Sequence, residues 1–426
     1  MIIKNAKIIV EQNKTIIQDI LIKNNKIQKI SNYIKDENEQ KINVQQRLIL
    51  PGGIDVHTHL REPGFLDKET IKTGSRAAAR GGYTTILAMP NINPHPDNPK
   101  MIERYLNLIK QESEVNVFPY ACITMQSNGK QIVDIESIKN IGINWLSDDG
   151  VGVQSVEVMR EALLTAYKYN VMICAHAEDM KYRKLNASIH EGIQSKKLNL
   201  IGIPNKCEYE QIKRDLQLAL ETKAQYHICH MSTKESVDLL DEYKKLGTNV
   251  SGEVTPHHLL LIDENIKNAN YKMNPPLRSE EDRQALINGL LNGTIDMIAS
   301  DHAPHTEEEK RLPIAEAPSG VVGLETSIPL IYTTFVKTKI LTLEMFQNII
   351  SKNPATRFGF LKKGQIKVGY DADLICLNEQ EKIIDKQKFI SKGKNTPFDG
   401  YKIEIDTILT IVNGEIKYID QSILKV

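Results

Sequence analysis

The sequence predicts an α/β protein with a (β/α)₈ TIM-like barrel and a small β-sandwich domain formed by both ends of the chain. Between residues 51 and 360, short apolar runs alternate with longer helical patterns. About eight such units over roughly 300 residues match a closed barrel of parallel strands. Residues 1–50 and 361–426 carry β-rich runs instead, and chain ends often lie close together. We therefore expect a barrel domain at 51–360 and a composite domain of 1–50 plus 361–426.

Composition narrows the class of protein. The 426 residues include 54 Lys+Arg and 54 Asp+Glu, so the formal net charge is zero, which argues against a nucleic-acid partner. The chain has no long apolar run and no signal-peptide pattern at its start, which argues against a membrane partner. Its five cysteines are scattered without CxxC spacing, as in reduced cytosolic proteins. We expect a cytoplasmic protein.

The two ends of the chain read as strands joined by turns. Residues 2–3, 7–10, 20–22 and 27–30 form short β-rich runs, with Gln12-Asn13 and Asn24-Asn25 as candidate hairpin turns. Near the other end, Asp371–Leu377 predicts a strand. Thr407–Lys417 predicts two strands around an Asn413-Gly414 turn. These strands can pair into one small domain.

The middle of the chain supplies the barrel elements. The candidate strands are Ile54–His59, Thr84–Pro90, Val115–Cys122, Gly142–Ser147, Val171–Ala175, Ala224–Cys229, Asn249–Val254 and Asp296–Ser300. Helical patterns between them include Ser155–Tyr169, Ser232–Lys245 and Ser279–Leu291. The alternation predicts the α/β class directly, whereas closure into a barrel is a further inference.

The end of the first barrel strand carries the most informative motif. His57 and His59 are two residues apart, so on an extended strand both rings point to the same face and can reach one metal ion. Arg61 continues that face just past the strand, where a cation can hold a carboxylate. Together these residues predict a metal site with an anion clamp beside it.

Residue types that bind metals also follow nearly all of the remaining candidate strands. They are Asn91, Asp148-Asp149, His176, His230, His257-His258, and Asp301 with His302 and His305. In such barrels the chemistry sits at the C-terminal strand ends, so these side chains are expected to meet. Taken singly, several have ordinary explanations. His176 and His230 can be buried core histidines, Asp148 or Asp149 a turn residue, and Asp301 a helix N-cap.

Other histidines are expected to lie outside the metal site. We expect a structural or supporting role for His257 and His258, and we predict that His95, His190 and His302 are not ligands. Imidazole and carboxylate groups without thiolates suit zinc in an open catalytic site, and the candidates are His57, His59, His176, His230, Asp301 and one of the pair Asp148-Asp149. Four histidines and two aspartates exceed the needs of one ion, whereas two ions that share a carboxylate would use them all.

Several motifs resemble those of dihydroorotase, type I, in the amidohydrolase superfamily, and the resemblance spans nearly the whole chain. They are Pro51-Gly-Gly-Ile-Asp-Val-His57-Thr-His59-Leu-Arg61-Glu-Pro-Gly64, Met89-Pro-Asn91, Asp148-Asp149-Gly-Val-Gly152, Met273-Asn274-Pro-Pro-Leu-Arg278 and Ala299-Ser-Asp301-His-Ala-Pro-His305. The resemblance implies reversible cyclisation of N-carbamoyl-L-aspartate to (S)-dihydroorotate, the third step of de novo pyrimidine (UMP) biosynthesis.

The resemblance also implies a ligand set. Two zinc ions per subunit would be bridged by Asp149 and a hydroxide. One ion would take His57, His59, Asp149 and Asp301, and the other Asp149, His176 and His230. Asp149 stands where other branches use a carbamylated lysine, so no lysine modification is expected.

Substrate contacts follow from the same resemblance. Arg61, Asn91 and His305 would hold the substrate carboxylate, and Asn274 would contact the ring. Asp301 would be the catalytic residue, taking a proton from the hydroxide and delivering it to the leaving nitrogen. The charged segment from His305 to Gly323 is expected to form a mobile lid or a rim over the site.

Two alternatives compete with this reading. Another cyclic amidase, such as a hydantoinase or an allantoinase, would bridge its metals with a carbamylated lysine, and the Arg61, Asn91 and His305 clamp argues against it. A non-catalytic dihydroorotase-like subunit would have lost ligands that are all present here. The resemblance further implies a small-molecule substrate, a homodimer, and association with aspartate transcarbamoylase as a possible complex.

Overall fold

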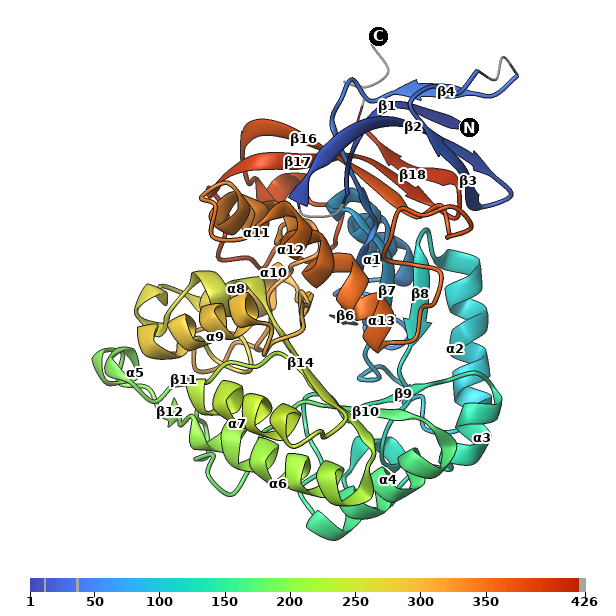
Figure 1. Ribbon diagram of the computed structural model, residues 1–426. Helices are drawn as coiled ribbons and strands as arrows, with labels where there is room; N and C mark the ends of the chain where they lie inside the picture. The colour runs from blue at the N-terminus through green and yellow to red at the C-terminus, as the bar shows by residue number, and fades with distance from the viewer. Residues whose placement is uncertain (11–12, 36–37, 421–426) are drawn as a thin grey trace.

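The predicted α/β class is confirmed. The computed structural model describes residues 1–10, 13–35 and 38–420. Figure 1 shows a sheet formed by both chain ends above a ring of strands and helices. In the described ranges, no helix has both the length and the apolar character that a membrane crossing requires.

The two chain ends form one sheet. Its strands are β1 (Ile2–Ile9), β2 (Thr15–Lys23), β3 (Lys26–Ser31), β4 (Lys41–Asn43), β5 (Leu48–Pro51), β16 (Leu374–Ile383), β17 (Lys402–Val412) and β18 (Glu415–Ile419). The hydrogen-bonded order is β18-β17-β16-β5-β1-β2-β3, and β4 pairs with β1. Antiparallel pairing of β5 with β16, which sets Leu48 opposite Leu377, joins the two ends. The exact domain boundaries stay a prediction.

Two of the predicted turns connect hairpins of this sheet. Asn24 and Asn25 have φ of 51° and 62°, and Asn413 and Gly414 have φ of 50° and 79°. Two-residue turns with positive φ at both positions favour asparagine and glycine, because other side chains are strained there. These turns were therefore visible in the sequence. The third candidate, Gln12-Asn13, includes Gln12, which lies outside the described residues.

All eight predicted barrel strands are present, mostly shorter than expected. They are β6 (Gly53–Thr58), β7 (Tyr83–Ala88), β8 (Asn116–Pro119), β9 (Trp145–Leu146), β10 (Met172–Ala175), β13 (Gln225–Ile228), β14 (Val250–Val254) and β15 (Met297–Ile298). They form two parallel sheets, β6-β7-β8 and β15-β14-β13-β10-β9. Parallel bridges Ala121–Leu146 and Thr58–His302 join the sheets at both seams. The ring of strands is thereby closed.

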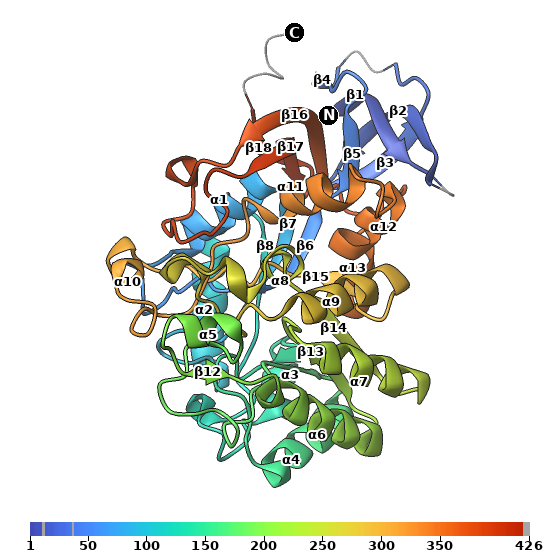
Figure 2. The same ribbon diagram turned by 90° about the vertical axis from the view of Figure 1, so that its left-hand side faces the viewer.

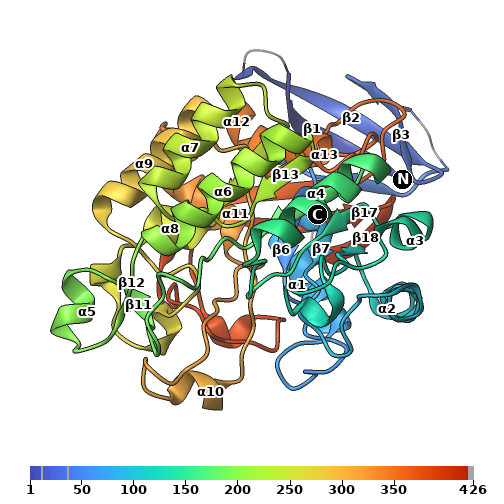
Figure 3. The same ribbon diagram turned by 90° about the horizontal axis from the view of Figure 1, so that it is seen from below.

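Helices cover the outside of this ring. The longer ones are α1 (Ile71–Gly81), α2 (Pro99–Glu112), α4 (Val156–Tyr169), α6 (Lys206–Thr222), α7 (Lys234–Lys245) and α9 (Glu280–Asn292). The predicted helices at 155–169, 232–245 and 279–291 correspond to α4, α7 and α9. Figure 3 shows α4, α6, α7 and α9 in sequence order around one side, and neighbouring members of this series pack together.

Short helices and strands connect the barrel strands and the longer helices. They are α3 (Ile135–Asn140), α5 (Ile193–Lys197), α8 (Pro256–Leu260), α10 (Glu307–Arg311), α11 (Ser327–Ile331), α12 (Leu343–Gln347), α13 (Asn353–Arg357), β11 (Ile189–His190) and β12 (Gly202–Ile203). In Figure 2, α5, β12 and α10 lie on one side of the barrel, away from the end sheet.

Apolar side chains fill the barrel interior. Met172, Cys174 and Cys229 belong to a buried cluster that Phe358 joins. Both cysteines are therefore packing residues, as their strand positions predict. Polar side chains take over where the strands end, and this is where the chemistry lies.

Candidate metal centre and substrate site

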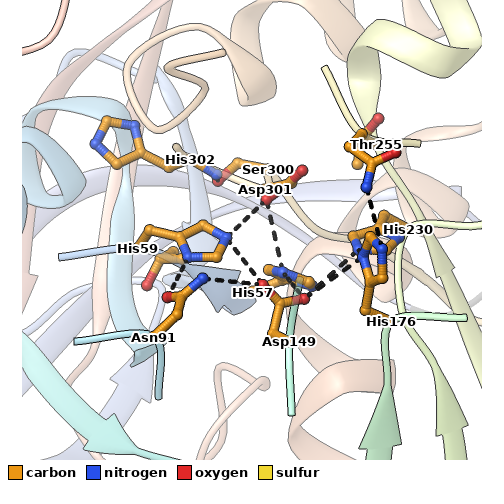
Figure 4. Close-up of polar contacts among 12 residues, drawn as sticks. His57, His59, Asn91, Asp149, His176, His230, Thr255, Ser300, Asp301 and His302 are labelled. Atoms are coloured by element: carbon orange, nitrogen blue, oxygen red, sulfur yellow. Dashed lines mark hydrogen bonds and ion pairs between the residues drawn. The ribbon is translucent and has the colours of Figure 1, made fainter. Parts of the chain in front are cut away.

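The six predicted metal ligands meet at the C-terminal ends of the barrel strands. They are His57 and His59 at the end of β6, Asp149 after β9, His176 after β10, His230 after β13 and Asp301 after β15. All six are buried, with at most 7% of each residue exposed. Figure 4 shows their polar groups pointing toward one another. Segments far apart in the sequence thus build one cluster.

Asp149 occupies the centre of the cluster. Its Oδ1 lies 3.4 Å from His57 Nε2, 3.7 Å from His230 Nε2 and 3.8 Å from His176 Nδ1. Its Oδ2 lies 3.6 Å from His59 Nε2. One carboxylate therefore faces all four imidazoles, which is the position that a shared ligand of two ions would take.

The other ligands form two groups on either side of Asp149. On one side, Asp301 Oδ1 lies 3.0 Å from His59 Nε2 and 3.6 Å from His57 Nε2. On the other side, His176 Nδ1 lies 2.9 Å from His230 Nε2. Donor atoms of His57, His59 and Asp301, and likewise of His57, Asp149 and His230, lie within 4.8 Å of one another.

The hydrogen bonding of the cluster fits a bound cation. His57 Nε2 and Asp149 Oδ1 are buried and lack a hydrogen-bond partner in the described part of the chain. An unsatisfied buried polar atom costs about 1–3 kcal/mol, and such atoms are rare in folded proteins. Metal coordination would satisfy both atoms. The donor set of imidazoles and carboxylates, without a thiolate, suits zinc in an open site.

The charges of neighbouring residues in the cluster shift one another's pKa values. Burial disfavours charge on His57, but the negative charges of Asp149 and Glu253 raise its pKa well above the ordinary value. Burial likewise opposes ionisation of Asp149, but His57 and His230 hold its pKa well below the ordinary value. Asp149 is therefore ionised at neutral pH, as a metal ligand must be.

The structure distinguishes the two adjacent aspartates. Asp148 Oδ1 accepts hydrogen bonds from the backbone N–H groups of Ile123 at 2.8 Å and Thr124 at 3.1 Å. Its other oxygen accepts from the Thr124 hydroxyl. Asp148 is thus a fully engaged structural residue, and Asp149 alone of the pair enters the cluster.

Asn91 and Asn274 lie at the edge of the cluster. Asn91 Oδ1 accepts from His59 Nδ1 at 2.8 Å, and its Nδ2 donates to Asp149 Oδ2 at 3.3 Å. Asn274 Nδ2 lies 3.2 Å from His176 Nε2 and donates to Glu178 Oε2 at 3.1 Å. Both amides are therefore within reach of a molecule at the cluster, but both also support proposed ligands.

Arg61 and His305 lie side by side next to the cluster. Arg61 Nη2 is 3.3 Å from His305 Nε2, and Arg61 Nε donates to Pro304 O at 3.2 Å. Arg61 makes no ion pair with a carboxylate anywhere in the described ranges. Asp301 and Asp149 interact with Arg61 only from beyond ion-pair distance, so its partly buried guanidinium is suited to direct contact with an anionic ligand.

Residues 305–320 form a rim beside the cluster that several hydrogen bonds hold in place. Thr306 caps α10 in a reciprocal capping box with Glu309. Lys310 is buried, and its ammonium donates to the carbonyl groups of Pro318 at 3.0 Å and Gly320 at 3.1 Å. His305 Nε2 lies 2.9 Å from Ser319 O. Residues 305–320 are therefore held together by hydrogen bonds next to Arg61, and their predicted mobility stays a prediction.

Ring nitrogens of His258 and His302 are hydrogen-bonded to other groups, whereas His257 Nε2 is buried without a hydrogen-bond partner in the described residues, so the non-ligand role of these histidines stays a prediction. His258 Nδ1 is 2.7 Å from Thr255 Oγ1, and its Nε2 is 3.1 Å from Pro275 O, so both nitrogens are engaged. His302 Nδ1 accepts from the Gly323 N–H at 3.2 Å. The N-cap explanation of Asp301 fails, because the next helix is capped by Thr306.

Two buried carboxylates of the site were not foreseen. Glu253 on β14 lies 2.7 Å from His57 Nδ1, and Glu178 lies 3.5 Å from His176 Nε2. Burial opposes ionisation of Glu253, but His57 and His227 lower its pKa to about 2. The signal in the sequence was a lone acidic residue inside the predicted strand 249–254. Glu253 lies within the strand and not at its end, so the strand-end pattern did not include it.

Comparisons with known proteins agree with this geometry. A family model described as dihydro-orotase-like matches residues 46–236. Curated dihydroorotases of Bacillus cereus (strain AH820) and Bacillus anthracis (strain CDC 684 / NRRL 3495) are each 47% identical over 424 residues, covering 99% of both chains.

Solved structures share the fold. The L-hydantoinase (dihydropyrimidinase) of Arthrobacter aurescens superimposes with a TM-score of 0.88 at 26% identity, covering 98% of this chain and 96% of that one. A dihydropyrimidinase of Brevibacillus agri NCHU1002 gives 0.86 at 23% identity, with coverage of 99% and 95%. The predicted barrel architecture is thereby confirmed.

Proposed function

This chain belongs to the dihydroorotase family, and we propose that the cluster of four histidines and two aspartates is its reaction centre. Its activity is that of a metal-dependent cyclic amide hydrolase, the dihydroorotase reaction. In that reaction N-carbamoyl-L-aspartate and (S)-dihydroorotate interconvert as a cyclic amide closes or opens, which is the third step of de novo pyrimidine biosynthesis.

We propose two zinc ions per subunit, bridged by Asp149 and a hydroxide. His57, His59, Asp149 and Asp301 would hold one ion, and Asp149, His176 and His230 the other. The unpartnered atoms of His57 and Asp149 support this assignment. Bound zinc would polarise the substrate carbonyl and lower the pKa of a water molecule at the site.

Asp301 is the proposed proton carrier. In ring opening, water adds to the amide carbonyl carbon, the ring C–N bond breaks, and a proton moves from the water to the leaving nitrogen. Burial alone would raise the pKa of Asp301, but His59 and His57 lower it far below the ordinary value. Asp301 is therefore ionised at neutral pH and can accept the proton before delivering it to nitrogen.

The substrate assignment rests on Arg61, which has no ion-pair partner among the described residues. Dihydroorotate has a carboxylate on its ring, and Arg61 presents a guanidinium that makes no ion pair with a carboxylate of the described residues. Asn91 and His305 complete the proposed carboxylate site, and Asn274 would contact the ring. An arginine fork recognises a carboxylate by two parallel hydrogen bonds.

Two alternatives make different predictions. A hydantoinase shares the fold, but a hydantoin ring lacks the carboxylate for which Arg61, Asn91 and His305 are suited. A non-catalytic subunit would not need six buried ligand side chains that converge on one point.

The decisive experiment measures metal content and ring opening together. Zinc-loaded protein is expected to contain two zinc ions per chain and to hydrolyse dihydroorotate, and Asp301→Ala is expected to lose about three orders of magnitude in kcat. Turnover of hydantoin but not dihydroorotate would favour the hydantoinase alternative. A carbamylated lysine detected by intact mass spectrometry would contradict the bridging role of Asp149.

We also propose a cytoplasmic homodimer that associates with aspartate transcarbamoylase, which rests on the family resemblance. Light scattering of the purified chain would measure its mass. Gel filtration with and without aspartate transcarbamoylase would detect the complex. A monomer that elutes unchanged in the mixture would contradict both proposals.

A further inference from the structure

Glu253 is a buried carboxylate that the proposed reaction does not use. It lies on β14, inside the barrel and beneath the metal cluster, with none of its surface exposed. Burial of a carboxylate is costly unless hydrogen bonds compensate for it. Its contacts therefore indicate why an acidic residue stands in this strand.

Three N–H groups converge on Glu253. Oε1 is 2.7 Å from His57 Nδ1 and accepts from the His230 backbone N–H at 3.1 Å. Oε2 is 3.0 Å from His227 Nε2. His57 and His230 are proposed ligands of different zinc ions, so one carboxylate contacts a ligand residue from each site.

The chain of contacts continues toward the closed end of the barrel. His227 Nδ1 is 2.7 Å from Ser251 Oγ, which accepts from Arg357 Nε at 2.6 Å. Ser251 and Glu253 are two residues apart on β14 and share a face, and His227 lies opposite Ser251 on β13. His227, Ser251 and Glu253 lie on barrel strands, and Arg357 lies on α13.

These contacts determine where the protons lie. A carboxylate only accepts hydrogen bonds, so both imidazoles that face Glu253 must donate to it. The neutral His57 ring then carries its proton on Nδ1, which leaves the lone pair of Nε2 directed at the metal cluster. His227 carries its proton on Nε2, so its Nδ1 accepts from the Ser251 hydroxyl. Both oxygens of Glu253, both ring nitrogens of His227 and the Ser251 hydroxyl therefore have hydrogen-bond partners.

Glu253 also supports the backbone at His230. His230 has φ of 30°, a conformation that is strained for a residue other than glycine. The 3.1 Å hydrogen bond from its N–H to Glu253 helps to hold this conformation, which points its ring into the cluster.

We propose that Glu253 is a positioning residue that orients one ligand of each zinc ion, through the His57 ring and the His230 backbone. This inference rests on the proposed two-zinc site and deepens it. Carboxylates that hold metal-bound histidines fix the tautomer and raise ligand basicity, and their loss typically weakens metal binding about 10- to 100-fold.

A third metal site is the main competing explanation of the same residues. Donor atoms of His57, Cys229 and Glu253 also lie within 4.8 Å of one another. However, His57 Nδ1 and Glu253 are already hydrogen-bonded, and burial raises the pKa of Cys229 to about 12, so the thiol keeps its proton. A protonated thiol is a poor ligand.

The tautomers can be tested without any substitution at Glu253. Metal-free full-length protein labelled with ¹⁵N-histidine would give long-range ¹H–¹⁵N correlation spectra, recorded at a pH high enough to neutralise the His57 ring and with signals assigned by His57→Asn and His227→Asn. The expected result is an Nδ1–H tautomer for His57 and an Nε2–H tautomer for His227. An Nε2–H tautomer for His57 would overturn the proposal.

Glu253→Gln tests the effect on metal. A glutamine can accept from His57 and His230 through its oxygen and donate to His227 through its nitrogen. We expect His227 to switch to the Nδ1–H tautomer and zinc affinity, measured by competition with a chromophoric chelator, to fall about 10- to 100-fold.

Asp263→Asn is the matched control. Asp263 lies 2.8 Å from His190 Nδ1, and both residues are buried away from the cluster. This control is expected to leave zinc affinity unchanged. Equal affinity of Glu253→Gln and wild type would refute the positioning role. If wild type itself binds no zinc, the proposed function fails, while the tautomer spectra still decide the role of Glu253.

Discussion

A buried carboxylate in the end sheet and one at the barrel mouth differ in how many of their oxygens have hydrogen-bond partners. In the end sheet, Asp19 accepts from the Asn5 N–H at 3.0 Å, the Ile34 N–H at 2.9 Å and the Lys4 ammonium. At the barrel mouth, Asp149 is buried to a similar degree, but its Oδ1 has no hydrogen-bond partner in the described residues.

The contrast separates structural from functional carboxylates. An acidic group that maintains the fold has all its lone pairs occupied by the protein, because each unpaired buried atom reduces stability. An acidic group that binds a metal ion or a ligand has at least one oxygen without a hydrogen bond from the protein. Asp148 and Asp149 repeat this contrast within two adjacent residues.

The largest effect is expected for Asp149→Asn. Losing the central carboxylate should remove zinc retention and lower dihydroorotate turnover by about 1000-fold or more, because both ions lose a shared ligand. Metal analysis and steady-state kinetics would measure these effects. Retention of two zinc ions by this variant would contradict the central position of Asp149.

Arg61→Met is expected to affect substrate binding and not metal binding. Losing a charge-assisted contact with the substrate carboxylate should lower kcat/KM for dihydroorotate about 100-fold, or about 3 kcal/mol. Zinc content should match that of wild type. If a neutral cyclic amide lost as much kcat/KM as dihydroorotate, Arg61 would not be the carboxylate contact.

Asp148→Ala should have the reverse effect of Asp149→Asn. Zinc content should be retained, whereas the free energy of unfolding should fall by about 1–3 kcal/mol, because the N–H groups of Ile123 and Thr124 lose their acceptor. Urea unfolding of the zinc-loaded proteins would measure the difference. Zinc loss without destabilisation would show that the two aspartates had been assigned the wrong way round.

The smallest effect is expected in the end sheet. Burial opposes ionisation of Asp19, but Lys4 and the N–H groups of Asn5 and Ile34 lower its pKa. A lowered pKa stabilises the fold above the unfolded-state value, about 3.9, and this stabilisation is lost as pH falls through the folded-state value.

Asp19→Asn should weaken this acid dependence. In wild type, hydrogen-exchange protection of the Asn5 and Ile34 amides should fall as pH decreases below about 4, and the fall should be smaller in the variant. Zinc content and turnover at neutral pH should not change. Identical protection profiles for the two proteins would show that Asp19 does not couple the sheet to pH.

Much of the architecture follows from local patterns. The eight barrel strands were predicted from short apolar runs, and the Asn24-Asn25 and Asn413-Gly414 turns from residues that tolerate positive φ. These features depend on neighbours in sequence. The meeting of metal-binding side chains was predicted because strand ends of a parallel barrel lie at one level, whereas the choice of Asp149 over Asp148 came from the family resemblance.

Other features depend on partners far away in the chain. Asp148 is structural because its donors come from residues 123 and 124, and the local Asp-Asp-Gly pattern does not distinguish it from Asp149. Glu253 was missed because its significance lies in His57, which is 196 residues away.

The sequence by itself determined which side chains stand at the mouth of the barrel, because strand periodicity and strand order are encoded locally. Only the tertiary structure decided which of their atoms are already hydrogen-bonded and which remain available. Satisfaction of a buried polar atom is a property of its surroundings, and those surroundings exist only once distant strands have closed into the ring.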